Sequence, residues 1–387
     1  MGEQRAAAVL LVLAFLGFAA IGLPDGLLGV AVPSIVGDFG IAPGEIGVLL
    51  ATFMVGYLVA SFASGRLLAR FGVGSVLVWS CVLTGASLLG YATAPCWAVM
   101  LAWSPLGGLG AGAIDAGINT YAATRHGVRT LNWLHACYGV GVTLGPLLLG
   151  VLFAAGQPWT AGYALVGTAQ LALGVAFAAT RTRWPPPAPA RTGAPVAASV
   201  RGTLRAPRVL AGVATFTTYT GIEAAAGVWA YSLFTTSRGV AESTAAAWVA
   251  AYWASFTVGR VLLGPVAERM LLRTFLRGAI ATMVAGAALL WLAPGALGPV
   301  GLMLLGIGCA PVFPSLMAAT PARVGAAHAP NAIGFQVCGA TVGQSALPAL
   351  VGTMAAHAGF EVLGPVLCAA SVLLFVLHET LGRVPPG

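Results

Sequence analysis

Twelve apolar segments, each long enough to cross a lipid bilayer, follow one another along this chain. A membrane-spanning helix needs about 20 mainly apolar residues, whereas a strand of a membrane barrel needs about ten residues of alternating character. These segments are too long for barrel strands and do not alternate. We therefore predict an all-α membrane protein with twelve transmembrane helices, over residues 7–33, 45–66, 74–93, 98–123, 132–155, 161–180, 209–234, 244–266, 275–293, 299–321, 332–356 and 361–380.

The charged residues are few and unevenly placed. Only 7% of the chain is charged, against about a quarter in an average soluble domain. The net charge of +8 comes from arginines in the short gaps between apolar segments, so we interpret these as topology signals and expect no nucleic-acid partner. The arginines occupy alternate gaps. By the positive-inside rule, we predict that the chain crosses the cytoplasmic membrane with both termini in the cytoplasm.

Landmark residues recur at nearly constant spacing in the two parts of the chain. Asp25 and Glu223 are 198 residues apart, and the pairs Gly65–Gly264 and Asn132–Asn331 are each 199 apart. Such an internal repeat is typical of transporters built from two related halves. We predict two pseudo-symmetric six-helix halves, 1–180 and 209–387, joined by a cytoplasmic linker, 181–208, that contains six arginines and six prolines.

Three carboxylates lie well inside predicted spans: Asp25, Asp115 and Glu223. Inserting a charged acid at the centre of a membrane helix costs about 2.5–3.5 kcal/mol. Burial disfavours the anion, so such an acid can be neutral in one conformation and charged in another, as proton coupling requires. We predict that Asp25 and Asp115 couple transport to protons. The alternative is a structural acid that stays protonated or hydrogen-bonded.

Polar and aromatic side chains at helical spacing suggest where a solute binds. Asn119 follows Asp115 by four residues, and Tyr138 follows His135 by three, so each pair shares a helix face. Amides, carboxylates and aromatic rings suit a polyhydroxylated ligand, although tryptophan and tyrosine also serve in packing and at the membrane interface. The predicted substrate-binding residues are Asn119, His135, Tyr138, Glu223, Trp229, Trp253 and Gln336.

Glycine and proline are abundant within the predicted spans, for example at Gly108, Gly112, Gly145 and Pro146. Small residues let helix backbones approach closely in lipid, which is the simpler interpretation. Smooth and kinked helices can also slide and bend, as alternating access requires.

Several other function classes lack their motifs. No GxxxxGK[ST] loop is present, and the chain has no lysine, so ATP-driven transport is not expected. The five histidines form no HExxH pair and the six cysteines no CxxC pair, so we expect neither an intramembrane metalloenzyme nor a metal or cofactor. The repeat and the buried acids argue against a channel. We expect a monomeric transporter, not an enzyme, whose partners are a small-molecule substrate and a coupling ion.

The chain resembles the major facilitator superfamily over essentially its whole length. The cytoplasmic-loop motif of that family, GxxxD/E-R, is present in the second half as Gly264, Glu268 and Arg269. The first-half copy runs from Gly65 to Arg70, with alanine in the place of the acid. The resemblance implies that these five residues belong to loops that act in gating.

Within that superfamily, the chain resembles the fucose/glucose-galactose:proton symporters. The resemblance rests on Asp25, on Asp115 with Asn119, on the run from Asn132 to Pro146, on Tyr219 with Glu223, and on Gly259-Arg260. It implies that the acids of the first and fourth spans serve proton coupling and sugar contact. In those symporters glutamate, glutamine and asparagine are usual where this chain has Asp115, His135 and Tyr138.

A second resemblance leaves the direction of transport open. The fifth span contains Gly141, Gly145-Pro146 and Gly150, a pattern similar to that of drug:proton antiporters. The sequence therefore predicts proton-coupled movement of a sugar-like solute, with proton-driven efflux of a drug or secondary metabolite as the alternative. Sodium remains the alternative coupling ion.

Overall fold

The computed structural model describes residues 2–125, 128–185, 199–293, 295, 297–325 and 327–383, all of them helical or in short connections. The first six long helices are α1 Gly2–Phe39, α2 Ile46–Phe71, α3 Val73–Ala92, α4 Trp97–Arg125, α5 Val128–Ala154 and α6 Trp159–Thr180. They are followed by α7 Val200–Leu204, α8 Pro207–Ser232, α9 Glu242–Arg269, α10 Leu272–Leu292, α11 Leu297–Cys309, α12 Val312–Val324, α13 Ala329–Ala358 and α14 Leu363–Arg383.

All twelve predicted spans coincide with helices, so the predicted all-α membrane fold is confirmed. Ten helical segments of the described chain are long and apolar enough to cross a membrane, with α11 and α12 counted as one. The other two predicted spans are α8 and α13, of 26 and 30 residues. Their lower hydropathy follows from polar side chains such as Glu223, Asn331 and Gln336.

The span predicted at 299–321 is interrupted. Helix α11 ends at Cys309 and α12 begins at Val312, after a turn at Ala310 and Pro311. Proline has no backbone N–H to donate to the preceding turn, and its ring clashes with the carbonyl four residues earlier. The sequence therefore breaks this helix where Pro311 stands.

Contacts divide the chain into two compact units. The first comprises Met1–Ile41, Val48–Ala190 and Glu242–Ala250, and the second Ala42–Gly47, Arg191–Ala241 and Ala251–Gly387. The predicted division into 1–180, 181–208 and 209–387 stays a prediction, because residues 186–198 lie outside the described part of the chain.

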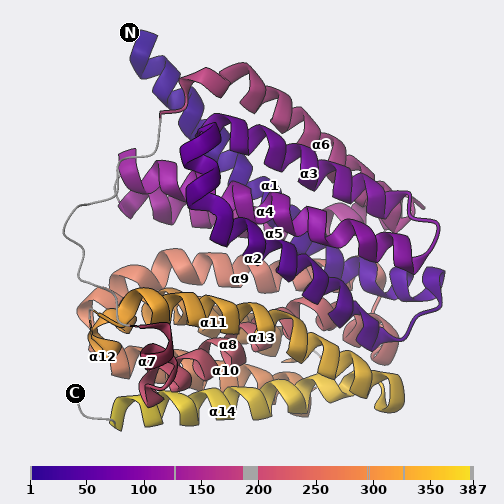
Figure 1. Cartoon of the computed structure of the whole chain (residues 1–387). Coiled ribbons are helices and arrows are strands. Elements are labelled where there is room, and N and C mark those ends of the chain that lie inside the picture. The colour runs from indigo at the N-terminus through magenta and orange to yellow at the C-terminus, as the bar shows by residue number, and fades with distance from the viewer. Residues whose placement is uncertain are drawn as a thin grey trace. The chain divides into compact units, whose positions relative to one another are not determined.

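The same helix pairings occur in both halves (Figure 1). In the first, α1 packs along α5, and α3 packs against α4 and α6. In the second, α8 packs along α13, and α10 packs against α11 and α14. In each half, therefore, the first span packs against the fifth, and the third span packs against both the fourth and the sixth. Repetition of the pairings agrees with the repeat predicted from the sequence.

Glycines set how closely the paired helices approach. A Cβ atom added to Gly26 of α1 would collide with the backbone carbonyl of Val142 in α5. A Cβ atom added to Gly343 of α13 would likewise collide with the carbonyl of Thr217 in α8. In lipid no water drives helices together, so their association depends on close backbone packing of this kind.

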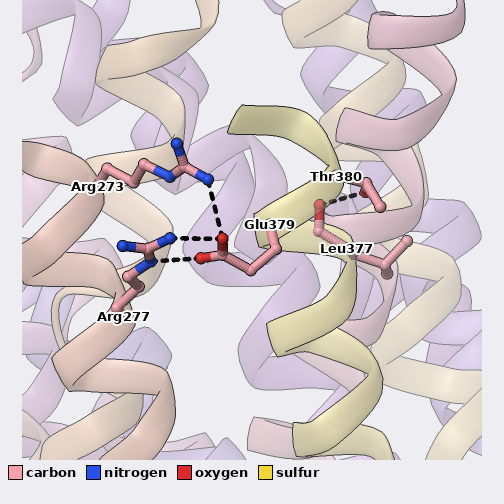
Figure 2. Close-up of polar contacts among 5 residues, drawn as sticks. All are labelled: Arg273, Arg277, Leu377, Glu379 and Thr380. Atoms are coloured by element: carbon pink, nitrogen blue, oxygen red, sulfur yellow. Dashed lines mark hydrogen bonds and ion pairs between the residues drawn. The ribbon is translucent and has the colours of Figure 1, made fainter. Parts of the chain in front are cut away.

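An ion cluster joins α10 to α14 near the C-terminus (Figure 2). The Glu379 carboxylate accepts hydrogen bonds from Arg277 at 2.6 Å and from Arg273 at 2.9 Å. Glu379 is mostly covered, whereas both arginine side chains are more than 40% exposed. Solvent therefore screens the pairs, and we interpret the cluster as fixing the alignment of the two helix ends more than as adding stability.

Candidate functional site

The predicted coupling residue Asp115 lies on α4, within a network of neutral partners. Its Oδ2 atom accepts a hydrogen bond of 2.8 Å from the hydroxyl of Tyr57 on α2. Its Oδ1 atom accepts one of 2.9 Å from the amide of Asn119, one turn further along α4. All three side chains are half-buried. Among the described residues, no arginine or histidine forms an ion pair with Asp115.

Close packing of α2 on α4 brings Tyr57 to Asp115. Cβ atoms added to Gly108 and Gly112 of α4 would press on the carbonyls of Phe53 and Tyr57. Because these glycines have no side chain, the two backbones come near enough for a tyrosine hydroxyl to reach the acid. The stripe of small residues above Asp115, visible in the sequence, therefore serves the site as well as the packing.

Asp25 has a separate partner within the same unit. The hydroxyl of Tyr138, on α5, donates a hydrogen bond of 2.7 Å to its Oδ2 atom. Asp25 is exposed on the surface of α1 and Tyr138 is half-buried. His135, one turn earlier on α5, places its ring edge-on to Phe18 with centroids 5.4 Å apart. The structure thus pairs one predicted coupling residue with one predicted substrate-binding residue.

A cavity of about 70 Å³ adjoins Asp25 among α1, α2, α3, α4 and α6. Its wall is mainly apolar, and its polar side chains are Asp25, Thr84, Ser87, Tyr91 and Tyr163. A water needs about 10–15 Å³ of such volume, so the cavity has room for a few waters or one small ring.

The acid of the second unit, Glu223 on α8, lies among tyrosines and one arginine. Tyr219 lies one helical turn earlier on α8, and the charge of Arg260 on α9 acts on the Glu223 carboxyl. The Tyr219 hydroxyl donates a hydrogen bond to the Cys309 carbonyl at 3.0 Å. The Tyr252 hydroxyl donates to the backbone carbonyl of Glu223 at 3.1 Å, which holds α8 against α9.

The other predicted residues of the second unit are buried. Trp229 is fully covered and its indole N–H donates to the Pro348 carbonyl at 2.9 Å. Gln336 is 3% exposed and accepts a hydrogen bond of 2.9 Å from Thr320. Trp253 is 7% exposed. These environments are also those of packing residues, so a role in solute binding stays a prediction.

The predicted gating residues lie at helix ends. Gly65 and Arg70 are in the last two turns of α2, and Gly264 and Arg269 are in the last two turns of α9. The side chains of Glu268 and of Asn132 lie outside the described residues. Tyr57 is the partner that the sequence analysis missed, because nothing in the sequence of α2 points to α4.

Comparison with known proteins identifies the family. The profile of the Major Facilitator Superfamily matches residues 14–304, more than half of the chain. The chain belongs to the major facilitator superfamily. It is therefore a multi-pass membrane transporter with the fold of this superfamily. No curated protein matches the chain by sequence.

Several solved structures are similar to this superfamily member over nearly its whole length. A bacterial homologue of the human lysosomal transporter Spinster, inward-facing and unoccupied, has a TM-score of 0.80 and 13% identity over 99% of both chains. The nucleoside transporter NupG has a TM-score of 0.76 and 13% identity over 98% of this chain and 100% of its own. A mutant of the E.coli fucose:proton symporter FucP has a TM-score of 0.67 and 16% identity over 99% of this chain and 100% of its own. At such identities the likeness concerns the fold.

Proposed function

We propose that this transporter moves a small polar solute, a sugar or sugar-like compound, across the cytoplasmic membrane in a proton-coupled cycle of alternating access. The observation that carries the proposal is the environment of Asp115, a carboxyl in a membrane span whose described partners, Tyr57 and Asn119, are both neutral. An acid without a cation is most cheaply neutralised by a proton. The same hydroxyl, amide and carboxyl groups can exchange hydrogen bonds with a polyol.

Two of the similar structures support this class of solute, because one is a nucleoside transporter and another a fucose:proton symporter. Under the proposal, Asp115 takes up a proton when solute binds, and loss of that proton on the other side weakens binding. A solute can shift such an equilibrium only through its different affinities for the two states. Asp25, paired with Tyr138, is the second site for the proton.

Efflux of a drug or secondary metabolite is the second candidate function. The cavity beside Asp25 favours it, because its wall is mainly apolar and would accept an alkyl or aromatic group more readily than a hydroxylated one.

Flux in proteoliposomes tests both candidates. Purified protein is reconstituted with an imposed pH gradient and offered labelled hexoses, nucleosides and amphipathic drugs. With the acidic side outside the vesicles, we expect the pH gradient to be dissipated faster when a hexose or nucleoside is added. Counterflow of the same solute should persist without a pH gradient. Movement of drugs alone would favour efflux, and movement driven only by a sodium gradient would refute proton coupling.

The orientation in the membrane is proposed from the arginine distribution and can be tested at the two ends of α8. Arg205 and Ser237 are exposed and stand just before and just after this span. In a cysteine-free background, Arg205→Cys should react with an impermeant thiol reagent only from the cytoplasm and Ser237→Cys only from outside. The reverse pattern, or reaction of both from one side, would refute the proposed orientation.

A further inference from the structure

Arg260 lies inside a membrane span of the second unit, and none of the described residues is an anionic partner for it. It is part of the candidate span Glu242–Ala267, and its side chain is half-buried. Among the described residues, no carboxylate oxygen lies within the 4.0 Å that defines an ion pair with it. Charged residues in membrane spans are costly and nearly always paired, so an unpaired one indicates a functional site.

The described residues around Arg260 hold the guanidinium in place but supply no hydrogen-bond acceptor. Its Cζ atom lies 4.2 Å from the centroid of the Phe256 ring, one turn earlier on α9. Its Nε atom is buried and has no hydrogen-bond partner among the described residues. Stacking on an aromatic ring orients the planar group and stabilises its charge, yet leaves the N–H edge unused.

A second unpartnered donor lies beside the same ring. Trp253 packs edge-on to Phe256, with ring centroids 5.8 Å apart. It is more than nine-tenths buried, and its indole nitrogen has no hydrogen-bond partner among the described residues. Buried donors without acceptors are rare in folded proteins. Two such donors beside the Phe256 ring indicate that a group accepting hydrogen bonds binds at this site.

Glu223 is near Arg260 but does not fill this role. The charge of Arg260 acts on its carboxyl, yet the two groups are not in ion-pair contact. The edge of the guanidinium is therefore left for another group.

We propose that Arg260 binds a carboxylate carried by the solute, with Trp253 as a neighbouring donor. The proposal rests on the proposed transport function and narrows the solute to acidic members of the sugar-like class, such as uronic acids. A carboxylate offers two oxygens in the geometry of the guanidinium fork and a charge that neutralises it, whereas a hydroxyl offers neither.

Direct binding to the purified full-length protein tests this, with glucuronate and glucose as a pair that differs at a single carbon. We expect wild-type protein to bind glucuronate more tightly than glucose. Arg260→Gln should raise the glucuronate Kd about 10- to 100-fold, the usual effect of losing charge-assisted hydrogen bonds, and change the glucose Kd less than threefold. Arg260→Lys keeps the charge without the fork and should show an intermediate loss. Arg201→Gln, an exposed arginine on α7, is the matched control and should change neither Kd.

The melting temperature of the ligand-free variants separates binding from structure. Removal of an unpaired membrane charge should leave the melting temperature unchanged or raise it. A lower melting temperature for Arg260→Gln would identify Arg260 as a structural residue and overturn the proposal. Equal binding of glucuronate and glucose by wild type, or equal losses in the variant, would overturn it as well. Binding is measured without flux, so the two proposals can fail separately. Transport of glucose without binding of glucuronate would refute this inference alone. Binding of glucuronate without flux of any solute would refute only the transport proposal.

Discussion

Replacement of Asp115 by asparagine is expected to abolish accumulation of solute against its gradient while preserving exchange of solute across the membrane. An amide resembles the protonated acid in shape and charge but cannot release a proton. Tyr57 can still donate to the amide oxygen, and Asn119 can rotate its own amide to accept from the new NH₂ group. The binding geometry therefore survives, and the coupling to protons is lost.

The measurement compares gradient-driven uptake with counterflow in the same proteoliposomes. We expect uptake to fall to the background of empty vesicles and counterflow to retain at least about a tenth of the wild-type rate, a loss equivalent to about 1.4 kcal/mol in the barrier. The pH dependence of exchange should also disappear. Asp38→Asn is a matched control, because Asp38 lies at the end of α1 and accepts a hydrogen bond from Trp159 of the same unit. Uptake by Asp115→Asn at the wild-type rate, with the wild-type pH dependence, would make Asp115 structural and transfer the coupling role to Asp25 or Glu223.

Replacement of Gly26 by alanine is expected to destabilise the first unit strongly, whereas the same change at Gly37 of the same helix should not. A Cβ atom at Gly26 would meet the Val142 carbonyl and the Pro146 ring, so α1 and α5 must separate. A Cβ atom at Gly37 has nothing within 4 Å. Overpacking of this kind costs about 1–3 kcal/mol and occasionally more.

The comparison is specific because the two substitutions are expected to change the melting temperature differently. Alanine is favoured over glycine in a helix by about 1 kcal/mol, so Gly37→Ala should raise the melting temperature slightly or leave it unchanged. Gly26→Ala should lower the melting temperature in detergent and the yield of monodisperse protein. Equal effects at both positions would show that helix propensity, and not the contact between α1 and α5, decides stability here.

The sequence by itself determined the membrane fold, because the length of an apolar segment is a local property and does not depend on what the segment contacts. All twelve spans predicted from the sequence coincide with helices. The spacing of Asp25 from Glu223 also predicted the repeat that is seen in the helix pairings. Only the break at Pro311 changed a predicted span, and proline is itself a local signal.

Tertiary structure alone decided which side chains meet. Tyr57 and Asp115 are 58 residues apart, and Asp25 and Tyr138 are 113 apart. Apolar helices resemble one another in hydropathy, so the sequence does not say which face of one packs on which neighbour. The sequence also does not show which side chains of a span are covered by neighbouring helices. Trp229 and Gln336 lie within predicted spans, and in the structure they are enclosed by α8, α12 and α13. The unpartnered state of Arg260 could be recognised only once the acids around it had been placed, because an ion pair depends on distances in space and not along the chain.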